Sequence, residues 1–139
     1  LVSANRNRDD YARLADRVVR DDQAPGQGPL AGMVTLLRTA CRPWLLCVPC
    51  DVPGVPAQLG LQLWQRAGAT GADIAVMRDA QGWHPTFCLL RTDLADDARD
   101  AFEAGERAPR RWFARHRVTE WQAPAPLNLN TPAGTHALE

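Results

Sequence analysis

Residues 43–53 read Pro-Trp-Leu-Leu-Cys-Val-Pro-Cys-Asp-Val-Pro. The apolar run is long enough for one buried β-strand, and it ends on Asp51, directly before a proline-rich turn. A carboxylate there lies at the C-terminal end of the strand, the edge where ligands bind in open α/β sheets. The alternative is that Asp51 caps the helix that Pro56 opens. The stretch therefore predicts an α/β fold in which Asp51 either binds a ligand or caps a helix.

Composition indicates one domain that has no electrostatic attraction to polyanions. The chain has 139 residues, of which 45% are hydrophobic, and this is enough to bury a core. We expect a single domain over residues 1–137, with Leu138 and Glu139 left from an expression tag. Lys and Arg together number 16, and so do Asp and Glu. The balance argues against nucleic-acid and membrane-surface binding. The absence of lysine excludes any mechanism that needs a lysine from this chain.

The sequence shows no signal peptide and no apolar run near the ~20 residues that a membrane span needs, so we expect a soluble cytoplasmic protein. The cysteines are expected to be buried and inert, at positions 41, 47, 50 and 88. Cys47 and Cys50 fit a C-x-x-C pattern, which makes a thiol-disulfide protein an alternative. Prolines hold the chain extended on both sides of Cys50, whereas a redox pair usually opens a helix.

Strand and helix patterns alternate along the chain, which predicts an α/β fold with a mostly parallel sheet. Helical spacing is found over residues 11–15, 29–39, 56–66, 94–104 and 107–116. Strand candidates cover residues 1–4, 17–20, 72–77, 84–90 and 127–132, and residues 117–121 are a further candidate that would add an antiparallel edge or a small hairpin. In the helix over 56–66 the expected core residues are Leu59, Leu61, Leu63 and Trp64, with glycines 68 and 71 at its end.

Short motifs stand in a fixed order along the chain. They are Ser3-Ala-Asn-Arg, Gly28-Pro-Leu-Ala-Gly, Pro49-Cys-Asp-Val-Pro, His84-Pro-Thr and Asn128-Leu-Asn-Thr-Pro. In order and spacing this set resembles the molybdenum cofactor guanylyltransferase family, also called the molybdopterin-guanine dinucleotide biosynthesis protein A family. The resemblance spans nearly the whole chain and implies a Rossmann-like three-layer nucleotidyltransferase fold.

The resemblance also implies a reaction. The phosphate of molybdopterin attacks the α-phosphate of GTP, forming the guanine dinucleotide cofactor and releasing pyrophosphate. Such chemistry needs two anionic phosphates aligned and their charge neutralised. Mg²⁺ is the expected metal, and Asp51 matches the family's metal-binding and catalytic aspartate. The substrates would be GTP and molybdopterin, and the expected protein partner is one in cofactor biosynthesis or a molybdoenzyme.

Further residue roles follow from the same matching. Positions on the GTP side are Ser3, Asp21, Gly28, Pro29, Leu30 and Asp51. Positions on the molybdopterin side are His84, Arg107, Asn128 and Asn130. Asparagine amides suit the hydrogen-bonding edge of a pterin, and the guanidinium of Arg107 suits its phosphate. The arginines at 110, 111, 115 and 117 are interpreted instead as a solvated surface.

The family begins with a strand, a glycine-rich loop, and an arginine and a lysine that hold the triphosphate, and none of these precedes Leu1. We therefore expect an N-terminally truncated chain that binds GTP poorly and catalyses little on its own. Two alternatives stay open at this point. One is a cytidylyltransferase relative of the same fold, and the other is a non-catalytic nucleotide- or pterin-binding remnant.

Overall fold

The structure is a computed structural model that describes the backbone of residues 2–3 and 18–19 and all atoms of residues 28–49 and 58–124. The chain divides into two compact units, which we describe separately. The first unit comprises Leu1–Leu45 with Arg91–Arg115, and the second comprises Leu46–Leu90 with His116–Glu139. The expected single domain over 1–137 stays a prediction, and the proposed tag residues lie outside the described part.

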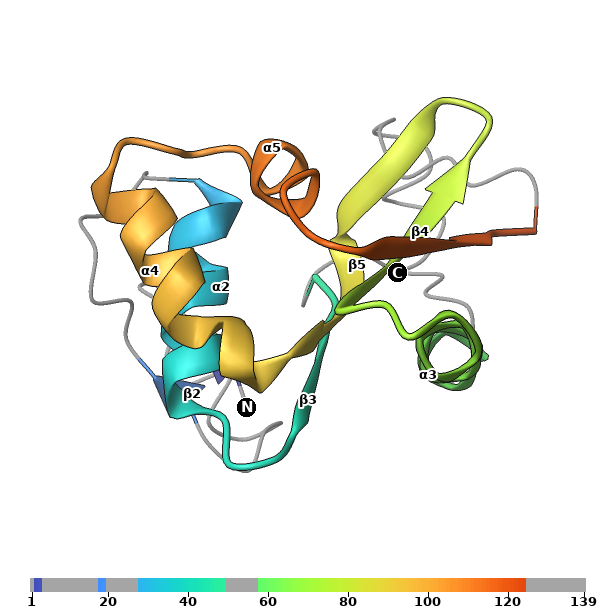
Figure 1. The fold of residues 1–139 in the computed structure, drawn as a ribbon, viewed down its shortest axis with the longest axis horizontal. Coiled ribbons are helices and arrows are strands. Elements are labelled where there is room, and N and C mark those ends of the chain that lie inside the picture. Colours follow the sequence, from blue (N-terminus) through green and yellow to red (C-terminus); the bar gives the residue numbers. More distant parts are fainter. Residues whose placement is uncertain (1, 4–17, 20–27, 50–57, 125–139) are drawn as a thin grey trace. The chain divides into compact units, whose positions relative to one another are not determined.

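The first unit contains short strands followed by helices (Figure 1). Strand β1 (Val2–Ser3) pairs in parallel with β2 (Val18–Val19). Helix α2 covers Pro29–Thr39, the range that its sequence pattern predicts. The 3-10 turn η1 (Thr92–Leu94) leads into α4 (Ala95–Glu103), and α5 (Pro109–Phe113) follows. Strand predictions over 1–4 and 17–20 and helix predictions over 94–104 and 107–116 are thus confirmed, with shorter helices than expected.

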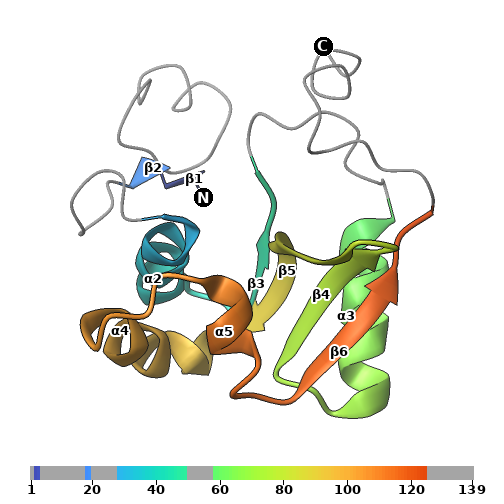
Figure 2. The same ribbon diagram turned by 90° about the horizontal axis from the view of Figure 1, so that it is seen from above.

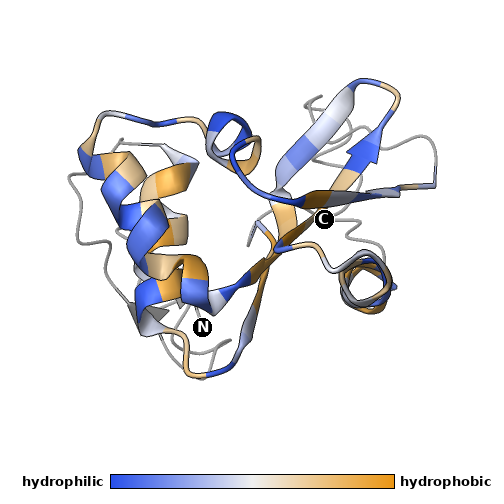
Figure 3. Ribbon diagram, in the orientation of Figure 1, coloured by the Kyte–Doolittle hydropathy of each residue, from blue (hydrophilic) through white to orange (hydrophobic). Residues whose placement is uncertain are grey.

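Helices α2 and α4 pack against each other and form the core of this unit (Figure 1). The buried face of α2 is formed by Leu30, Ala31, Met33, Val34, Thr35 and Leu37, and that of α4 by Ala98, Ala101 and Phe102. The remaining positions of α4 are mostly charged, which Figure 3 shows as blue segments on this helix. Trp112 and Phe113 of α5 are also fully buried. Burial of these apolar faces, rather than helix propensity, therefore holds the short helices in place.

The sheet associated with the second unit has the order β3-β5-β4-β6. Its strands are β3 (Trp44–Cys47), β4 (Ile74–Asp79), β5 (Gly82–Arg91) and β6 (Val118–Gln122). Helix α3 (Leu59–Thr70) packs on β4 and β6, as Figure 2 shows. Gly71 ends α3 in a left-handed conformation with φ of 67°, as predicted, whereas Gly68 lies inside the helix.

The strand directions correct the expected topology. Strand β6 runs parallel to β4, so the expectation of an antiparallel edge over 117–121 is wrong. The antiparallel partner of β4 is instead β5, joined to it by a tight turn at Ala80 and Gln81. The sheet is therefore mixed rather than mostly parallel, while the α/β class is confirmed. The strands predicted at 72–77 and 84–90 both extend into the turn that separates them.

Several apolar residues are more exposed than the sequence predicts. In β3 only Cys47 is buried, and Leu46 is 43% exposed, so this is not the fully buried strand expected for residues 43–48. Among the described strands β3 is an end strand of its sheet, which leaves one edge without a neighbour. In α3, Leu61 and Trp64 are exposed because the 3.6-residue period places only Leu59, Leu63 and Ala67 on the buried face.

The thiols also differ from expectation at one position. Cys47 and Cys88 are buried, whereas Cys41 is exposed, contrary to the prediction that all cysteines are buried. All three are free thiols, and Cys50 lies outside the described residues. Burial, together with the neighbouring Cys47 thiol, raises the pKa of Cys88. Of the helices that the structure describes, none has the length and apolar character to cross a membrane.

Candidate functional site

Part of the predicted site falls on residues that the structure does not describe. These are Asp21, Asp51, Asn128 and Asn130. Ser3 lies in β1, and only its backbone is described. The metal role of Asp51, the nucleotide roles of Ser3 and Asp21 and the pterin roles of the asparagines therefore stay predictions. The described candidates lie in two places, the start of α2 and the loop at Arg107 in the first unit, and the hairpin that carries His84 in the second.

The start of α2 is built from residues predicted on the GTP side. Gly28 precedes the helix with φ of 90° and ψ of 177°, a conformation that favours glycine, and Pro29 occupies the first turn. The N-cap residue, Gly28, has no side chain that could accept a hydrogen bond from the first N–H groups of the helix. The side chain of Leu30 is fully buried, so its predicted role on the GTP side would fall to its backbone. Any contact made here to an anionic group would therefore come from the backbone.

Arg107, predicted on the molybdopterin side, lies next to Gly28 in the same unit. A Cβ atom placed on Gly28 would be 3.6 Å from the carbonyl oxygen of Arg107. The guanidinium of Arg107 is held by its own loop: Nη1 donates to the carbonyl oxygens of Phe102 at 2.7 Å and of Glu106 at 2.9 Å. Its central carbon also lies 3.8 Å from the centre of the Phe102 ring. The bond to the Phe102 carbonyl oxygen caps the C-terminal end of α4. Together these contacts fix the position of the guanidinium.

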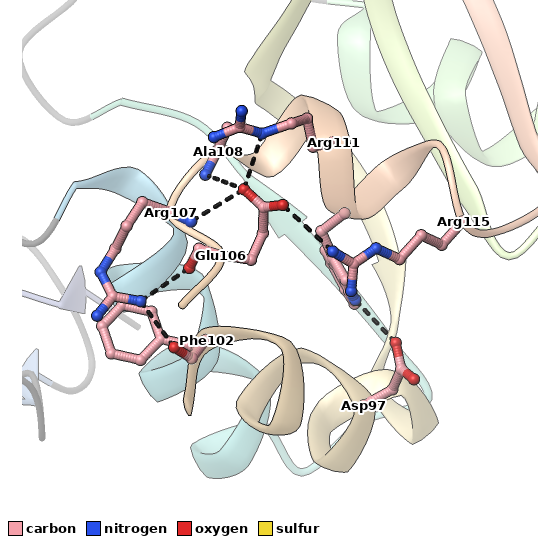
Figure 4. A network of polar contacts seen from close by, with 8 residues as sticks. Asp97, Phe102, Glu106, Arg107, Ala108, Arg111 and Arg115 are labelled. Carbon is pink, nitrogen blue, oxygen red and sulfur yellow. Dashed lines mark hydrogen bonds and ion pairs between the residues drawn. The ribbon is translucent and has the colours of Figure 1, made fainter. Parts of the chain in front are cut away.

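Glu106 organises the loop that carries Arg107 (Figure 4). Its Oε1 accepts the backbone N–H of Arg107 at 3.0 Å, the N–H of Ala108 at 2.9 Å and Nε of Arg111 at 3.0 Å. Its Oε2 accepts Nη2 of Arg115 at 3.2 Å. The side chain is only 10% exposed, although both arginines are mostly exposed. One carboxylate therefore joins the loop backbone to α5 and to Arg115 beyond its end.

These bonds lower the pKa of Glu106. The largest cause is the hydrogen bond from the Ala108 N–H, and the bonds from Arg111 and the Arg107 N–H act in the same direction. Partial burial opposes them by raising the pKa, without reversing the net direction. The group is therefore a carboxylate at neutral pH. Sequence patterns did not single out Glu106, because its partners meet only once the loop and α5 are folded.

The arginine-rich segment is exposed, as the sequence interpretation expects. Arg110, Arg111, Arg115 and Arg117 all lie at the surface. Arg111 and Arg115 pair with Glu106, and Nε of Arg117 lies 3.5 Å from Oδ2 of Asp73. On the inner side of α5, Nε1 of Trp112 donates to Oδ2 of Asp97 at 2.8 Å.

His84 belongs to the second unit, where the β4–β5 hairpin places it beside Asp79. Nε2 of His84 and Oδ2 of Asp79 are 2.7 Å apart, and each side chain is 12% exposed. The other oxygen of Asp79 accepts the N–H of Gln81 at 2.8 Å within the turn. The hydrogen bond to His84 is the largest cause that lowers the pKa of Asp79, followed by the bond from Gln81. Asp79 is thus an ionised partner of a predicted site residue.

A second cluster on the hairpin joins neighbouring strands. Oε2 of Glu120 accepts Nη1 of Arg78 at 2.7 Å and Nε1 of Trp83 at 2.6 Å. Arg78 and Trp83 face each other across β4 and β5, and Glu120 comes from β6. The cluster fixes the register of the strands near the turn that carries Asp79. Local sequence patterns single out neither Asp79 nor this cluster, because the members of the cluster come from three strands that meet only in the folded sheet.

The fold and these residues define a class of protein. The model of the MobA-like NTP transferase domain family matches residues 1–120, most of the chain. The chain therefore belongs to this family of nucleotidyltransferases. The expected Rossmann-like nucleotidyltransferase fold is confirmed by this match and by the solved structures described below.

Individual relatives carry a more specific name. A protein of Burkholderia ambifaria (strain MC40-6) named molybdenum cofactor guanylyltransferase is 46% identical over 129 residues, which are 86% of this chain and 63% of that protein. A Pseudomonas aeruginosa protein of the same name is 42% identical over 136 residues, covering 95% of this chain and 69% of the relative. The chain thus spans just under two thirds of the Burkholderia relative.

Solved structures show the same fold at low sequence identity. Molybdopterin-guanine dinucleotide biosynthesis protein A from Archaeoglobus fulgidus has a TM-score of 0.72 and 18% identity, covering 94% of this chain and 71% of that one. The 2-C-methyl-D-erythritol 4-phosphate cytidylyltransferase from Thermus thermophilus has a TM-score of 0.62 and 16% identity, covering 93% and 83%. At these identities the likeness establishes the fold alone.

Proposed function

We propose that the protein containing this chain transfers GMP from GTP to the phosphate of molybdopterin, with release of pyrophosphate. The observation that carries the proposal is the 46% identity over 129 residues to a relative named molybdenum cofactor guanylyltransferase. The fold does not choose between guanylyl and cytidylyl transfer, because a cytidylyltransferase shares it at 16% identity. The names of the sequence relatives therefore support guanylyl transfer as the choice in this proposal.

The geometry of the first unit supports a transferase with two substrates. Gly28, proposed for the nucleotide, and Arg107, proposed for the pterin phosphate, lie next to each other although they are far apart in the sequence. Joining two phosphates requires that both substrates be held side by side before reaction. The Glu106 hydrogen bonds to the Arg107 and Ala108 N–H groups would keep this loop in one place. Arg107 would meet a phosphate with a guanidinium already held by backbone carbonyls.

The donor chemistry of the chain fits Mg²⁺. No group of three or more His, Cys, Asp or Glu side chains that could hold a metal occurs among residues 28–49 and 58–124. Magnesium usually binds one or two carboxylates together with substrate phosphates, so Asp51 alone would suffice from the protein. When bound there, the ion would neutralise charge on the phosphates. Asp51 would hold it at the end of the segment that follows β3.

The experiment compares Asp51→Asn with a matched control, Asp96→Asn, in the intact gene product. Asp96 lies in the first turn of α4 with its side chain 86% exposed. With GTP, molybdopterin and Mg²⁺, we expect Asp51→Asn to lose at least about a hundredfold in GMP transfer, since several kcal/mol of charge stabilisation would be removed. Asp96→Asn should retain wild-type activity. Equal activity of both variants would refute the metal role, and GTP binding without turnover would indicate a non-catalytic binding protein.

A further inference from the structure

The β4–β5 hairpin holds His84 in a defined orientation. Asp79 and Gly82 are the last pair before the turn, and Met77 pairs with His84. Asp79 and His84 thus lie diagonally opposed on the same face of the hairpin, where Oδ2 and Nε2 meet at 2.7 Å. The Phe87 ring lies nearly perpendicular to the imidazole, at a centroid distance of 6.4 Å and an interplanar angle of 87°. The ring therefore has a hydrogen bond at Nε2 and an aromatic neighbour.

The Asp79 carboxylate is itself fixed and can only accept. Its Oδ1 accepts the Gln81 N–H at 2.8 Å, which leaves Oδ2 for His84. An ionised carboxylate has no proton to donate, so the hydrogen of this bond must belong to Nε2. In the neutral imidazole the other nitrogen, Nδ1, then carries a lone pair and acts as an acceptor.

Nδ1 of His84 makes no hydrogen bond to the residues that the structure describes, and it is not fully buried. Among residues 28–49 and 58–124, Nε of Arg78 is the side-chain nitrogen or oxygen that is fully buried and has no hydrogen-bond partner. Nδ1 of His84 does not belong to this class of atoms. Nδ1 makes none of the hydrogen bonds of His84, whose bonded nitrogen is Nε2. Nδ1 therefore keeps some exposure, although the side chain as a whole is only 12% exposed. A partly exposed acceptor on a nearly buried ring is suited to one directed hydrogen bond.

We propose that Asp79 is a positioning residue that holds His84 as the Nε2–H tautomer, so that Nδ1 accepts a hydrogen bond from a ring or amino N–H of the pterin. This inference rests on the function proposed above, in which His84 belongs to the molybdopterin side. A lone pair at Nδ1 does not favour an anionic phosphate oxygen, which also only accepts. His84 would thus recognise the pterin ring, while phosphate binding falls to other residues. Asp79 acts through His84 and does not touch the ligand.

Replacement of Asp79 by Asn offers a near-isosteric test. The Asn oxygen can still accept the Gln81 N–H, so the turn keeps its bond. The Asn amide then points a donor at Nε2, which favours the opposite tautomer with a proton on Nδ1. An acceptor would become a donor at the position proposed for the pterin N–H. The control is Asp100→Asn, a surface residue whose side chain is 69% exposed.

The measurement is ¹⁵N NMR of the histidine side chains, combined with titration of a stable 6-substituted pterin that carries a phosphate. In the wild type we expect the Nε2–H tautomer and a shift of the Nδ1 resonance on adding the pterin. Asp79→Asn should move the tautomer to Nδ1–H and weaken pterin binding by about tenfold, the loss of one directed hydrogen bond. Asp100→Asn should match the wild type in both respects.

Contrary results are distinguishable. An Nδ1–H tautomer in the wild type, or unchanged pterin affinity in Asp79→Asn, would overturn this inference and leave the proposed function intact. A wild-type protein that does not bind the pterin at all would overturn the inference together with the molybdopterin part of the function. If Asp79→Asn does not fold, the wild-type titration decides alone, because an Nδ1 resonance unmoved by bound pterin contradicts the proposal.

Discussion

The carbonyl oxygen of Arg107 lies beside Gly28: a Cβ on Gly28 would lie 3.6 Å from that oxygen. This close approach brings the start of α2 beside the loop between α4 and α5. The distance is an ordinary van der Waals separation, so a methyl group would fit. What restricts position 28 is its φ of 90°, which residues with a side chain rarely adopt.

Gly28→Ala is therefore expected to lower the free energy of unfolding by about 1–3 kcal/mol, the cost of holding alanine in this conformation. Gly68→Ala is the matched control, because Gly68 lies inside α3 and nothing is within 4 Å of its Cβ position. There alanine should stabilise by about 0.5–1 kcal/mol, since it has the higher helix propensity. Urea unfolding measures both. A Gly28→Ala protein as stable as the wild type would contradict the strained conformation.

Glu106→Gln should lower stability at neutral pH, because it removes the charge that binds two backbone N–H groups and the Arg111 and Arg115 side chains. The pKa of Glu106 is lowered on folding from its ordinary value of 4.5. Its stabilisation is therefore complete above that value and is lost as the pH falls through the lower, folded pKa.

Thermal unfolding between neutral pH and pH 3 checks this prediction. The wild type should lose stability in the acid range, and Glu106→Gln should lose less across the same range. Glu103→Gln, an exposed position at the end of α4, should follow the wild-type curve. Parallel acid profiles for the wild type and Glu106→Gln would mean that the carboxylate does not anchor the loop.

Trp112→Phe should destabilise the first unit by about 1–3 kcal/mol, because it leaves a cavity at a fully buried position and removes the bond to Asp97. Trp64→Phe is the control: this residue is 53% exposed, and its replacement should change stability by no more than about 0.5 kcal/mol. The two variants can be compared by urea unfolding. Equal effects would show that α5 does not pack as described.

Thiol labelling tests the alternative of a redox protein. In the native state Cys41 should react rapidly with a maleimide, because it is exposed, while Cys47 and Cys88 should react slowly, because they are buried. The raised pKa of Cys88 slows it further by reducing its thiolate fraction. Peptide mapping by mass spectrometry assigns each site. If Cys47 is labelled as fast as Cys41, the result would support the alternative that the chain is a thiol-disulfide protein.

Local signals in the sequence predicted the elements that depend on neighbours along the chain. Pro29 at a helix start and the apolar spacing after it predicted the full range of α2. The hairpin was missed because its turn, Ala80-Gln81, lacks the usual Asn-Gly or Gly-Gly pair. A side-chain bond from Asp79 to the Gln81 N–H supports it instead.

Contacts between distant residues account for what the sequence could not predict. The partners of Glu106 lie up to nine residues away and meet only when α5 packs. The direction of β6 could not be predicted, because a period-2 pattern is the same for parallel and antiparallel strands. Only its parallel pairing with β4 in the folded sheet reveals that direction. In the candidate site, Gly28, Pro29, Leu30, His84 and Arg107 could be placed in the fold. The resemblance to a family suggested these positions, but not the partners Asp79 and Glu106.

The most direct test of the central claim is the mass of the product formed by the intact gene product from molybdopterin, Mg²⁺ and an equimolar mixture of GTP and CTP. The proposed function predicts that the guanine dinucleotide forms together with an equal amount of pyrophosphate, and that the cytosine dinucleotide is at most a minor product. A product containing cytosine, or no dinucleotide from a folded protein that binds both substrates, would contradict it.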